Sequence, residues 1–253
     1  MAQHLYILTG ASRGMGLALA NQLLHRGATL LTISRNPAHM LHAQAVAHNA
    51  GLYQWSYDLS VPQGAADQLL QWLPQQWQRQ PPLSATLINN AAIIPTIAPL
   101  SASDWSQIGS ALRVGLQAPM LLTSAFLQAT QDWCIPKKVL NISSGLGRRA
   151  MASQATYCAI KAGLDNFSSS VALEESLKPH GARICALAPG VIDTDMQVQL
   201  RSACIASFPD AQRFADLQAQ GLLTSAQDAA TQVLAWLDRM DFGSQVIADV
   251  RNP

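Results

Sequence analysis

The stretch "LYILTGASRGMG", residues 5–16, decides the fold of this chain. Its first five residues form an apolar run that ends at a glycine, as a buried β-strand does. Gly10, Gly14 and Gly16 then allow a tight turn, and "MGLALANQLLHR" (15–26) has the apolar spacing of a helix. A turn of this kind between a first strand and a first helix offers free N–H groups and the positive end of the helix dipole to a pyrophosphate. We therefore expect a dinucleotide cofactor at this turn.

The same alternation of strand-like and helix-like segments continues through the rest of the chain. Strands that alternate with helices pair in parallel through right-handed crossovers. We predict an α/β fold of the Rossmann type: a doubly wound parallel sheet of about seven strands with helices on both faces, in one domain over residues 1–253. The expected strands are 5–9, 29–34, 52–57, 85–89, 138–143, 183–188 and 244–250, and the expected helices are 15–26, 37–49, 64–78, 103–130, 155–178 and 225–239, with a helical insertion at 195–220.

Composition narrows the classes of function. Of 253 residues, 49% are hydrophobic and 12% are charged, and the net charge is +1, so we expect neither a nucleic acid nor a membrane as partner. No apolar run reaches the ~20 residues that span a bilayer. The four cysteines form no metal-binding pattern, so we expect no metal. They are typical of reduced thiols, and we expect a cytoplasmic protein.

The end of the second strand indicates which nucleotide binds. An NAD site usually has an acidic residue there, which binds the ribose hydroxyls. In this chain the position is "SRN", Ser34 to Asn36, and no Asp or Glu precedes Asp58. Arg35 could pair with a 2′-phosphate, and Arg13 in the glycine turn could approach it from the other side. The sequence therefore favours NADP over NAD.

Tyr157 and Lys161 are four residues apart in a predicted helix, and therefore lie on one face of it. A cation beside a phenol favours the phenolate, so we expect Lys161 to lower the pKa of Tyr157. An isolated pair with this spacing is more often a packed tyrosine and a solvated lysine. Several polar residues follow predicted strands at the edge where ligands bind in such sheets: Asn89–Asn90, Ser143–Ser144 and Pro189–Gly190.

Five motifs together resemble those of the short-chain dehydrogenases/reductases, in order and in spacing: "TGASRGMG" (9–16), "NNAA" (89–92), "NISSG" (141–145), "YCAIK" (157–161) and "PGVIDTDM" (189–196). The resemblance implies that Tyr157 gives a proton to a carbonyl and that Lys161 binds the nicotinamide ribose. It also implies that Ser144, with Ser143 as the weaker alternative, hydrogen-bonds the substrate carbonyl. The catalytic residues expected on this basis are Ser144, Tyr157 and Lys161.

The resemblance also implies a set of residues that bind NADP(H). Asp58 would hold the adenine, Asn90 and Ala91 would line the ribose, and residues 191–194 would contact the carboxamide. The whole set is Gly10, Ser12, Arg13, Gly14, Met15, Gly16, Ser34, Arg35, Asn36, Asp58, Leu59, Asn90, Ala91, Tyr157, Lys161, Pro189, Gly190, Val191 and Thr194.

Two residues depart from the family pattern. Ala92 stands where the family usually has glycine, and its methyl group would crowd the cofactor slightly. Gly115 stands where the long helix normally carries an asparagine that completes a proton relay. In relatives the main-chain carbonyl at this position holds the relay water and the asparagine fixes a local distortion of the helix. Glycine keeps the carbonyl and distorts easily, and it vacates volume that could hold a water.

Within the family, the chain looks most like bacterial benzil reductases and sepiapterin reductases. This predicts NADPH-dependent reduction of a small apolar ketone or vicinal diketone, aromatic compounds included. A pterin would need an acidic residue near the C-terminus, where Asp241 and Asp249 are found. The segment 195–222 either packs as a core or forms an apolar lid. The alternatives to this activity are a cofactor-binding sensor without turnover, which Gly115 supports, and an NAD-dependent alcohol dehydrogenase, which Arg35 opposes.

The long helices 103–130 and 155–178 carry apolar residues beyond the needs of one sheet face, namely Leu116, Met120, Phe167 and Val171. In the family these helices pair across a two-fold axis, and one patch then serves both subunits. We therefore expect a homodimer or homotetramer.

Overall fold

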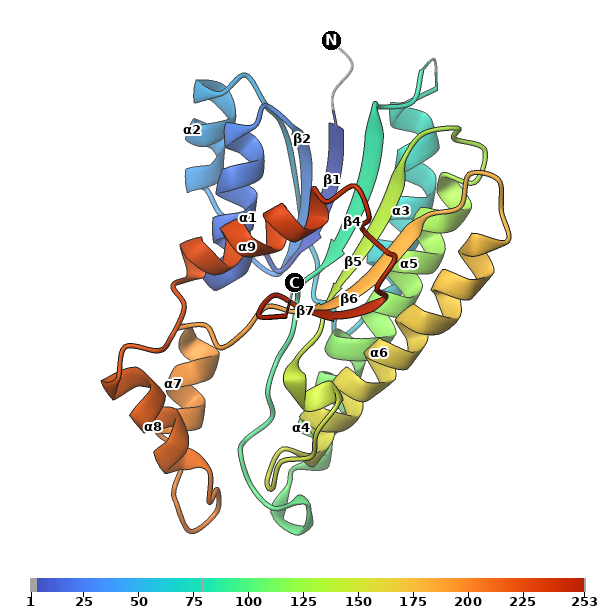
Figure 1. Cartoon of the computed structure of the whole chain (residues 1–253). Helices are drawn as coiled ribbons and strands as arrows, with labels where there is room; N and C mark the ends of the chain where they lie inside the picture. Colours follow the sequence, from blue (N-terminus) through green and yellow to red (C-terminus); the bar gives the residue numbers. More distant parts are fainter. Residues whose placement is uncertain (1–3, 79, 253) are drawn as a thin grey trace.

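The computed structural model describes residues 4–78 and 80–252. Its centre is a seven-stranded parallel sheet with the strand order β3-β2-β1-β4-β5-β6-β7, so the predicted fold class is confirmed (Figure 1). The strands are β1 (His4–Thr9), β2 (Thr29–Ser34), β3 (Gly51–Ser56), β4 (Ser84–Asn89), β5 (Lys137–Ile142), β6 (Arg183–Ala188) and β7 (Ile247–Asp249). The strand order reverses between β1 and β4, and ligands of open α/β sheets bind at such a point.

Helices cover both faces of the sheet. On one face, α1, α2 and α9 pack over a core that includes Leu19, Leu23 and Val233. On the other face, α3, α5 and α6 pack over a second core that includes Leu69, Phe126 and Val171 (Figure 1). The bounds of these helices are α1 (Gly14–His25), α2 (Met40–Ala47), α3 (Gln63–Gln76), α5 (Ala118–Ala129), α6 (Ala155–Ser176) and α9 (Ala226–Leu237).

The long helix expected at 103–130 is interrupted. Asp104 caps its first part, α4 (Trp105–Leu112), by accepting a hydrogen bond from the backbone N–H of Ser106. A π-helical segment, Arg113–Gln117, then joins α4 to α5. Short π segments within α-helices occur frequently at functional sites, and this one contains Gly115.

The helical insertion expected at 195–220 forms two helices, α7 (Asp195–Arg201) and α8 (Ala211–Ala219). They extend away from the sheet beyond the carboxyl ends of the strands (Figure 1). Phe208 and Phe214 stack with ring centroids 5.8 Å apart and form a small core with Leu200 and Ala211. The insertion therefore has apolar packing of its own, in addition to any contact it makes with a ligand.

Candidate active site

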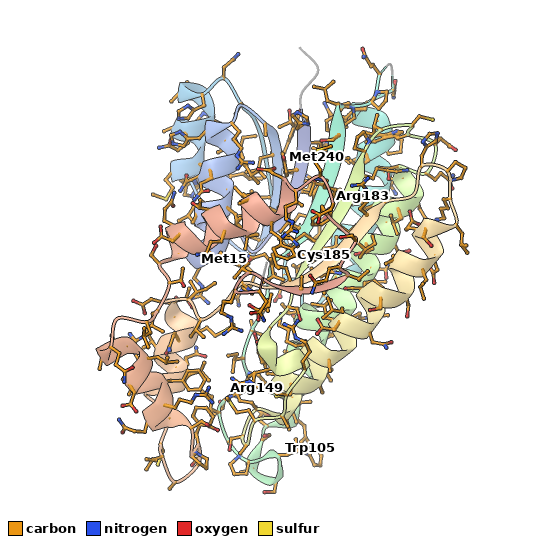
Figure 2. All side chains as sticks on the ribbon, viewed as in Figure 1. Met15, Trp105, Arg149, Arg183, Cys185 and Met240 are labelled. Atoms are coloured by element: carbon orange, nitrogen blue, oxygen red, sulfur yellow. The ribbon has the colours of Figure 1, made fainter. Side chains whose placement is uncertain are left out.

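A cavity of about 920 Å³ lies at the carboxyl ends of the strands, between the sheet and helices α7 and α8. Every catalytic and cofactor-binding residue predicted from the sequence lines this cavity, with the exception of Asn36. The structure therefore brings together segments from the whole length of the chain. Arg149, in the loop before α6, lies on the side of the molecule that faces α7 and α8, as Figure 2 shows, and it lines the cavity as well.

The glycine turn after β1 is built by close contacts between main-chain segments. Gly10 and Gly14 have φ of +72° and +54°, in the left-handed region that favours glycine. A side chain on Gly16 would place its Cβ 2.0 Å from the carbonyl oxygen of Gly10, so only glycine fits. Asn90 fastens the turn to the end of β4, because its Nδ2 donates to the carbonyl oxygens of Thr9 (3.0 Å) and Gly10 (3.2 Å).

Arg35 and Asp58 line the end of the cavity that is expected to hold the adenine. Hydrogen bonds from Ser60 lower the pKa of Asp58, and the Arg35 guanidinium lowers it further. Ser34 stabilises the glycine turn, because its Oγ accepts a hydrogen bond from the backbone N–H of Ala11 at 2.9 Å. Asn36 does not line the cavity, so the structure gives no support to its predicted role in binding the cofactor.

Arg13 forms an ion pair that the sequence did not predict. Its Nη1 lies 2.8 Å from Oδ2 of Asp195, the first residue of α7, although we expected this arginine to be available for a 2′-phosphate. Both side chains are largely exposed, and an exposed ion pair contributes only about 0–1 kcal/mol. Arg13 could therefore exchange Asp195 for a phosphate at little cost.

Tyr157 and Lys161 are both buried on α6, and Ser144 follows β5 beside them. The Ser144 hydroxyl interacts with the Tyr157 phenol and also accepts a hydrogen bond from the backbone N–H of Leu146 at 3.2 Å. The alternative serine, Ser143, is buried and donates to the Asp165 carboxylate. Both serines line the cavity, but the Ser143 hydroxyl already donates its hydrogen to Asp165, so Ser144 is the better candidate to donate to a ligand.

The pKa values of this pair differ from the expectation. Burial raises the pKa of Tyr157 to about 12, and the interaction with Ser144 lowers it only in part. The pKa of Tyr157 is therefore raised and not lowered as expected, because desolvation of the buried phenol disfavours the phenolate. Burial also lowers the pKa of Lys161 to about 8, although the nearby Asp165 raises it. The Lys161 Nζ donates to the carbonyl oxygen of Ile142 at 2.7 Å and lies 5.5 Å from the centroid of the Tyr157 ring.

Gly115 lies in the π-helical segment, directly against Ile160. A Cβ added to Gly115 would lie 2.7 Å from Cγ2 of Ile160, a distance shorter than real carbon atoms adopt. The helix is therefore distorted without the asparagine, but the vacated volume expected from the sequence is not open to water. The Ile160 side chain, which is 1% exposed, occupies it.

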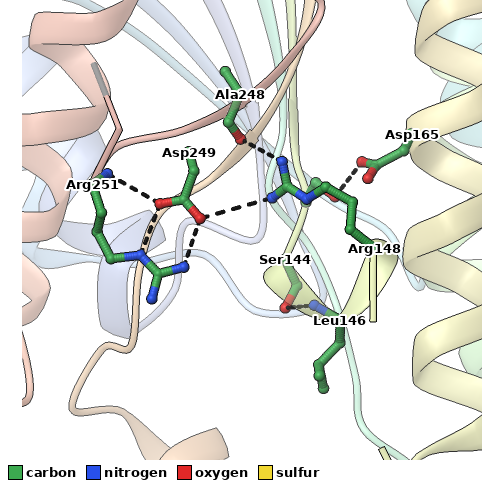
Figure 3. Close-up of polar contacts among 8 residues, drawn as sticks. Ser144, Leu146, Arg148, Asp165, Ala248, Asp249 and Arg251 are labelled. Atoms are coloured by element: carbon green, nitrogen blue, oxygen red, sulfur yellow. Dashed lines mark hydrogen bonds and ion pairs between the residues drawn. The ribbon is translucent and has the colours of Figure 1, made fainter. Parts of the chain in front are cut away.

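Two acidic residues considered for a pterin-binding role do not line the cavity. Asp249 accepts two hydrogen bonds from the Arg251 side chain, at 2.8 and 2.6 Å, and lies 3.9 Å from Arg148 (Figure 3). These bonds lower the pKa of Asp249. Asp241 is paired with Arg239. The structure thus provides no acidic pterin anchor at either position.

Several residues that line the cavity were missed at the sequence level. They are polar or charged, occur singly, and belong to no motif: Ser110, Arg149, Gln154, Gln197, Arg213 and Arg251. Only Gln154 carried a signal that could have revealed it, because it stands three residues before Tyr157 and so near the same helix face.

Other expectations concern metals, cysteines and membranes. Within residues 4–78 and 80–252, no group of three or more His, Cys, Asp and Glu side chains is arranged to hold a metal ion. All four cysteines are free thiols, and the cytoplasmic location stays a prediction. No helix in the described part of the chain has the length and apolar character needed to cross a bilayer.

Comparison with known proteins decides the family. The family model described as short chain dehydrogenase matches residues 4–204. The chain belongs to this family. It is 34% identical to the benzil reductase ((S)-benzoin forming) of Bacillus cereus over 236 residues, covering 93% of this chain and 94% of the relative. It is 30% identical to the sepiapterin reductase of Mus musculus over 258 residues, covering 96% and 95% of the two chains.

A solved structure extends this likeness. The crystal structure of a short-chain dehydrogenase/reductase from Burkholderia vietnamiensis has 30% sequence identity and a TM-score of 0.66, and the match covers 99% of this chain and 98% of that chain. As a member of the family, the protein is an oxidoreductase that uses a nicotinamide cofactor and acts on a small molecule. The motifs quoted from the sequence identified this family correctly.

The contact between Gly115 and Ile160 predicts a coupling between these positions. Gly115→Asn should lower the free energy of unfolding by about 1–3 kcal/mol, because it overpacks the site. Ile160→Ala should also lower it, by about 2–5 kcal/mol, because it leaves a cavity. The double variant should lose at least about 1 kcal/mol less than the sum of the single losses, because the asparagine then occupies the space of the isoleucine. Denaturant unfolding of the four proteins measures this, and losses that add within about 0.5 kcal/mol would show that the contact does not matter.

Proposed function

We propose that this protein is an NADPH-dependent carbonyl reductase that acts on a small apolar ketone or vicinal diketone. The observation that carries the proposal is that Ser144 and the buried Tyr157 and Lys161 line the same cavity as the glycine turn. The likeness to a benzil reductase supports the substrate class, because benzil is an aromatic vicinal diketone. Apolar side chains of the cavity, among them Ile94, Leu146, Met196, Leu200 and Phe214, suit such a compound.

The chain's residues can supply the proton and the orientation that the reaction needs. NADPH, when bound, supplies the hydride that reaches the carbonyl carbon. Ser144 donates a hydrogen bond to the carbonyl oxygen, and Tyr157 gives that oxygen its proton. The raised pKa of Tyr157 keeps the phenol protonated at neutral pH. Lys161, which is cationic below pH about 8, then stabilises the phenolate that remains.

The π-helical distortion at Gly115 argues against the alternative function, a cofactor-binding sensor without turnover. That alternative depended on the missing asparagine, but the π-helical segment is present without it. The NAD-dependent alcohol dehydrogenase gains no support either, because Arg35 lines the cavity and no acidic residue follows β2 directly. We therefore retain carbonyl reduction as the proposal.

Consumption of NADPH across diketones, quinones, pterins and steroids tests the activity. We expect turnover of aromatic diketones, and Tyr157→Phe should lower kcat by about 10²–10⁴-fold, because it removes the general acid. Unchanged turnover in Tyr157→Phe would contradict the assignment. The pH profile of kcat/KM provides a second readout, because it reports the free enzyme. It should fall as the pH rises through about 8, where Lys161 loses its proton.

We expect Arg35 to determine the preference for NADPH over NADH. Loss of a charge-assisted hydrogen bond costs about 1.5–3 kcal/mol, so Arg35→Ala should weaken NADPH binding by roughly tenfold or more and leave NADH binding nearly unchanged. Arg13→Ala should have a smaller effect, because Arg13 must first leave Asp195. Fluorescence titration with both cofactors measures these losses. Equal losses for NADPH and NADH in Arg35→Ala would show that Arg35 does not bind the 2′-phosphate.

We also infer a homodimer or homotetramer that forms through α4, α5 and α6. Exposed apolar side chains on these helices support this: Leu112, Met120, Leu173 and Leu177 are 38%, 42%, 71% and 86% exposed. Val171, which the sequence suggested for the same surface, packs in the core instead. Light scattering at micromolar concentration should give twice or four times the mass of one chain, and a monomer would refute the inference.

A further inference from the structure

Two buried glutamine side chains in the cavity have none of their hydrogen bonds satisfied. Gln154 and Gln197 are 3% and 2% exposed, and both line the cavity. For each of them, neither Nε2 nor Oε1 has a hydrogen-bond partner among the residues that the structure describes. Buried polar groups are nearly always hydrogen-bonded, so carboxamides left in this state indicate that something else bonds to them.

Both glutamines are close to the reacting end of the cavity. Gln154 directly precedes α6 and stands three residues before Tyr157 in the chain, and both residues line the cavity. Gln197 is on α7 and follows Met196, whose Sδ is 4.0 Å from the Tyr157 hydroxyl. The two carboxamides thus belong to two different elements that meet at Tyr157.

The chemistry of a carboxamide limits what it can bind. It is neutral and offers two donors and one acceptor, so it suits a neutral oxygen, whereas the cavity has arginines for an anion. The carbonyl oxygen of a second ketone, next to the carbonyl that is reduced, is a neutral oxygen of this kind.

We propose that Gln154 and Gln197 form a polar subsite that binds the second oxygen of a vicinal dicarbonyl substrate. The inference rests on the proposed carbonyl reduction and narrows its substrate class. Ser144 and Tyr157 bind the oxygen that is reduced, and the two glutamines bind the neighbouring one. The enzyme therefore prefers vicinal dicarbonyls to monoketones of the same shape.

A matched pair of compounds tests the subsite. Benzil has two adjacent carbonyls, and deoxybenzoin has the same two phenyl rings with a CH₂ in place of one carbonyl. Gln154→Met and Gln197→Met remove the carboxamide and keep an unbranched side chain. Each should lower kcat/KM for benzil at least tenfold and change that for deoxybenzoin less than threefold. The higher intrinsic reactivity of benzil cancels when each variant is compared with the wild-type protein.

Two controls separate this role from a structural one. Gln71→Met makes the same change at an exposed position of α3 and should leave both substrates unaffected. The melting temperature of Gln154→Met and Gln197→Met should stay equal or rise, because a buried polar group without a partner is removed. Their affinity for NADPH should stay within twofold of wild type. Parallel losses for both compounds, or a loss of NADPH affinity that accounts for the change, would overturn the subsite.

Calorimetric binding of benzil to the protein with NADP⁺ separates failure of the subsite from failure of the proposed function. If the wild-type protein reduces neither compound, carbonyl reduction of these substrates fails. In that case the subsite proposal still predicts that the methionine variants bind benzil at least tenfold more weakly than the wild-type protein. Equal binding by the variants and the wild-type protein would overturn the proposal.

Discussion

The close approach of main chain to main chain at the switch point of the sheet is the constraint on which the site depends. Gly16 lies so near the carbonyl of Gly10 that no side chain fits, and the Asn90 carboxamide bonds the turn to the neighbouring strand. A Cβ on Gly10 would likewise come within 2.9 Å of the Cα of Ala91. This contact fixes where α1 begins and hence where its N–H groups point.

The second half of the site depends on how α6 is buried. Tyr157 and Lys161 lie on the inner face of this helix, and desolvation moves their pKa values in opposite directions, to about 12 and about 8. The phenol therefore keeps its proton and the ammonium holds its own less tightly than in water. Both adjacent serines line the cavity, but Ser143 is buried and its hydroxyl donates to Asp165, whereas Ser144 is only partly buried and interacts with Tyr157.

The sequence alone predicted those features for which a local pattern of residues is compatible with only one local structure. Apolar runs between glycines predicted the strands, and five motifs predicted which residues line the cavity. Contacts between residues that are far apart in the sequence could not be predicted from it. Nothing local shows that Arg13 pairs with Asp195, 182 residues away, or that Ile160 occupies the space beside Gly115. A distortion near Gly115 was expected, but not its π-helical form, because the residues there have ordinary helical spacing. The two glutamines were missed because a single glutamine belongs to no pattern.

The packing of Ile160 against Gly115 has a consequence for how this sequence can evolve. Asparagine at 115 would need a smaller residue at 160, and this chain, with isoleucine at 160, needs glycine at 115. A substitution at only one of the two positions gives a protein in which the space between residues 115 and 160 is either overpacked or left as a cavity. The two positions are therefore expected to change together, because the residue at each limits the size of the residue at the other.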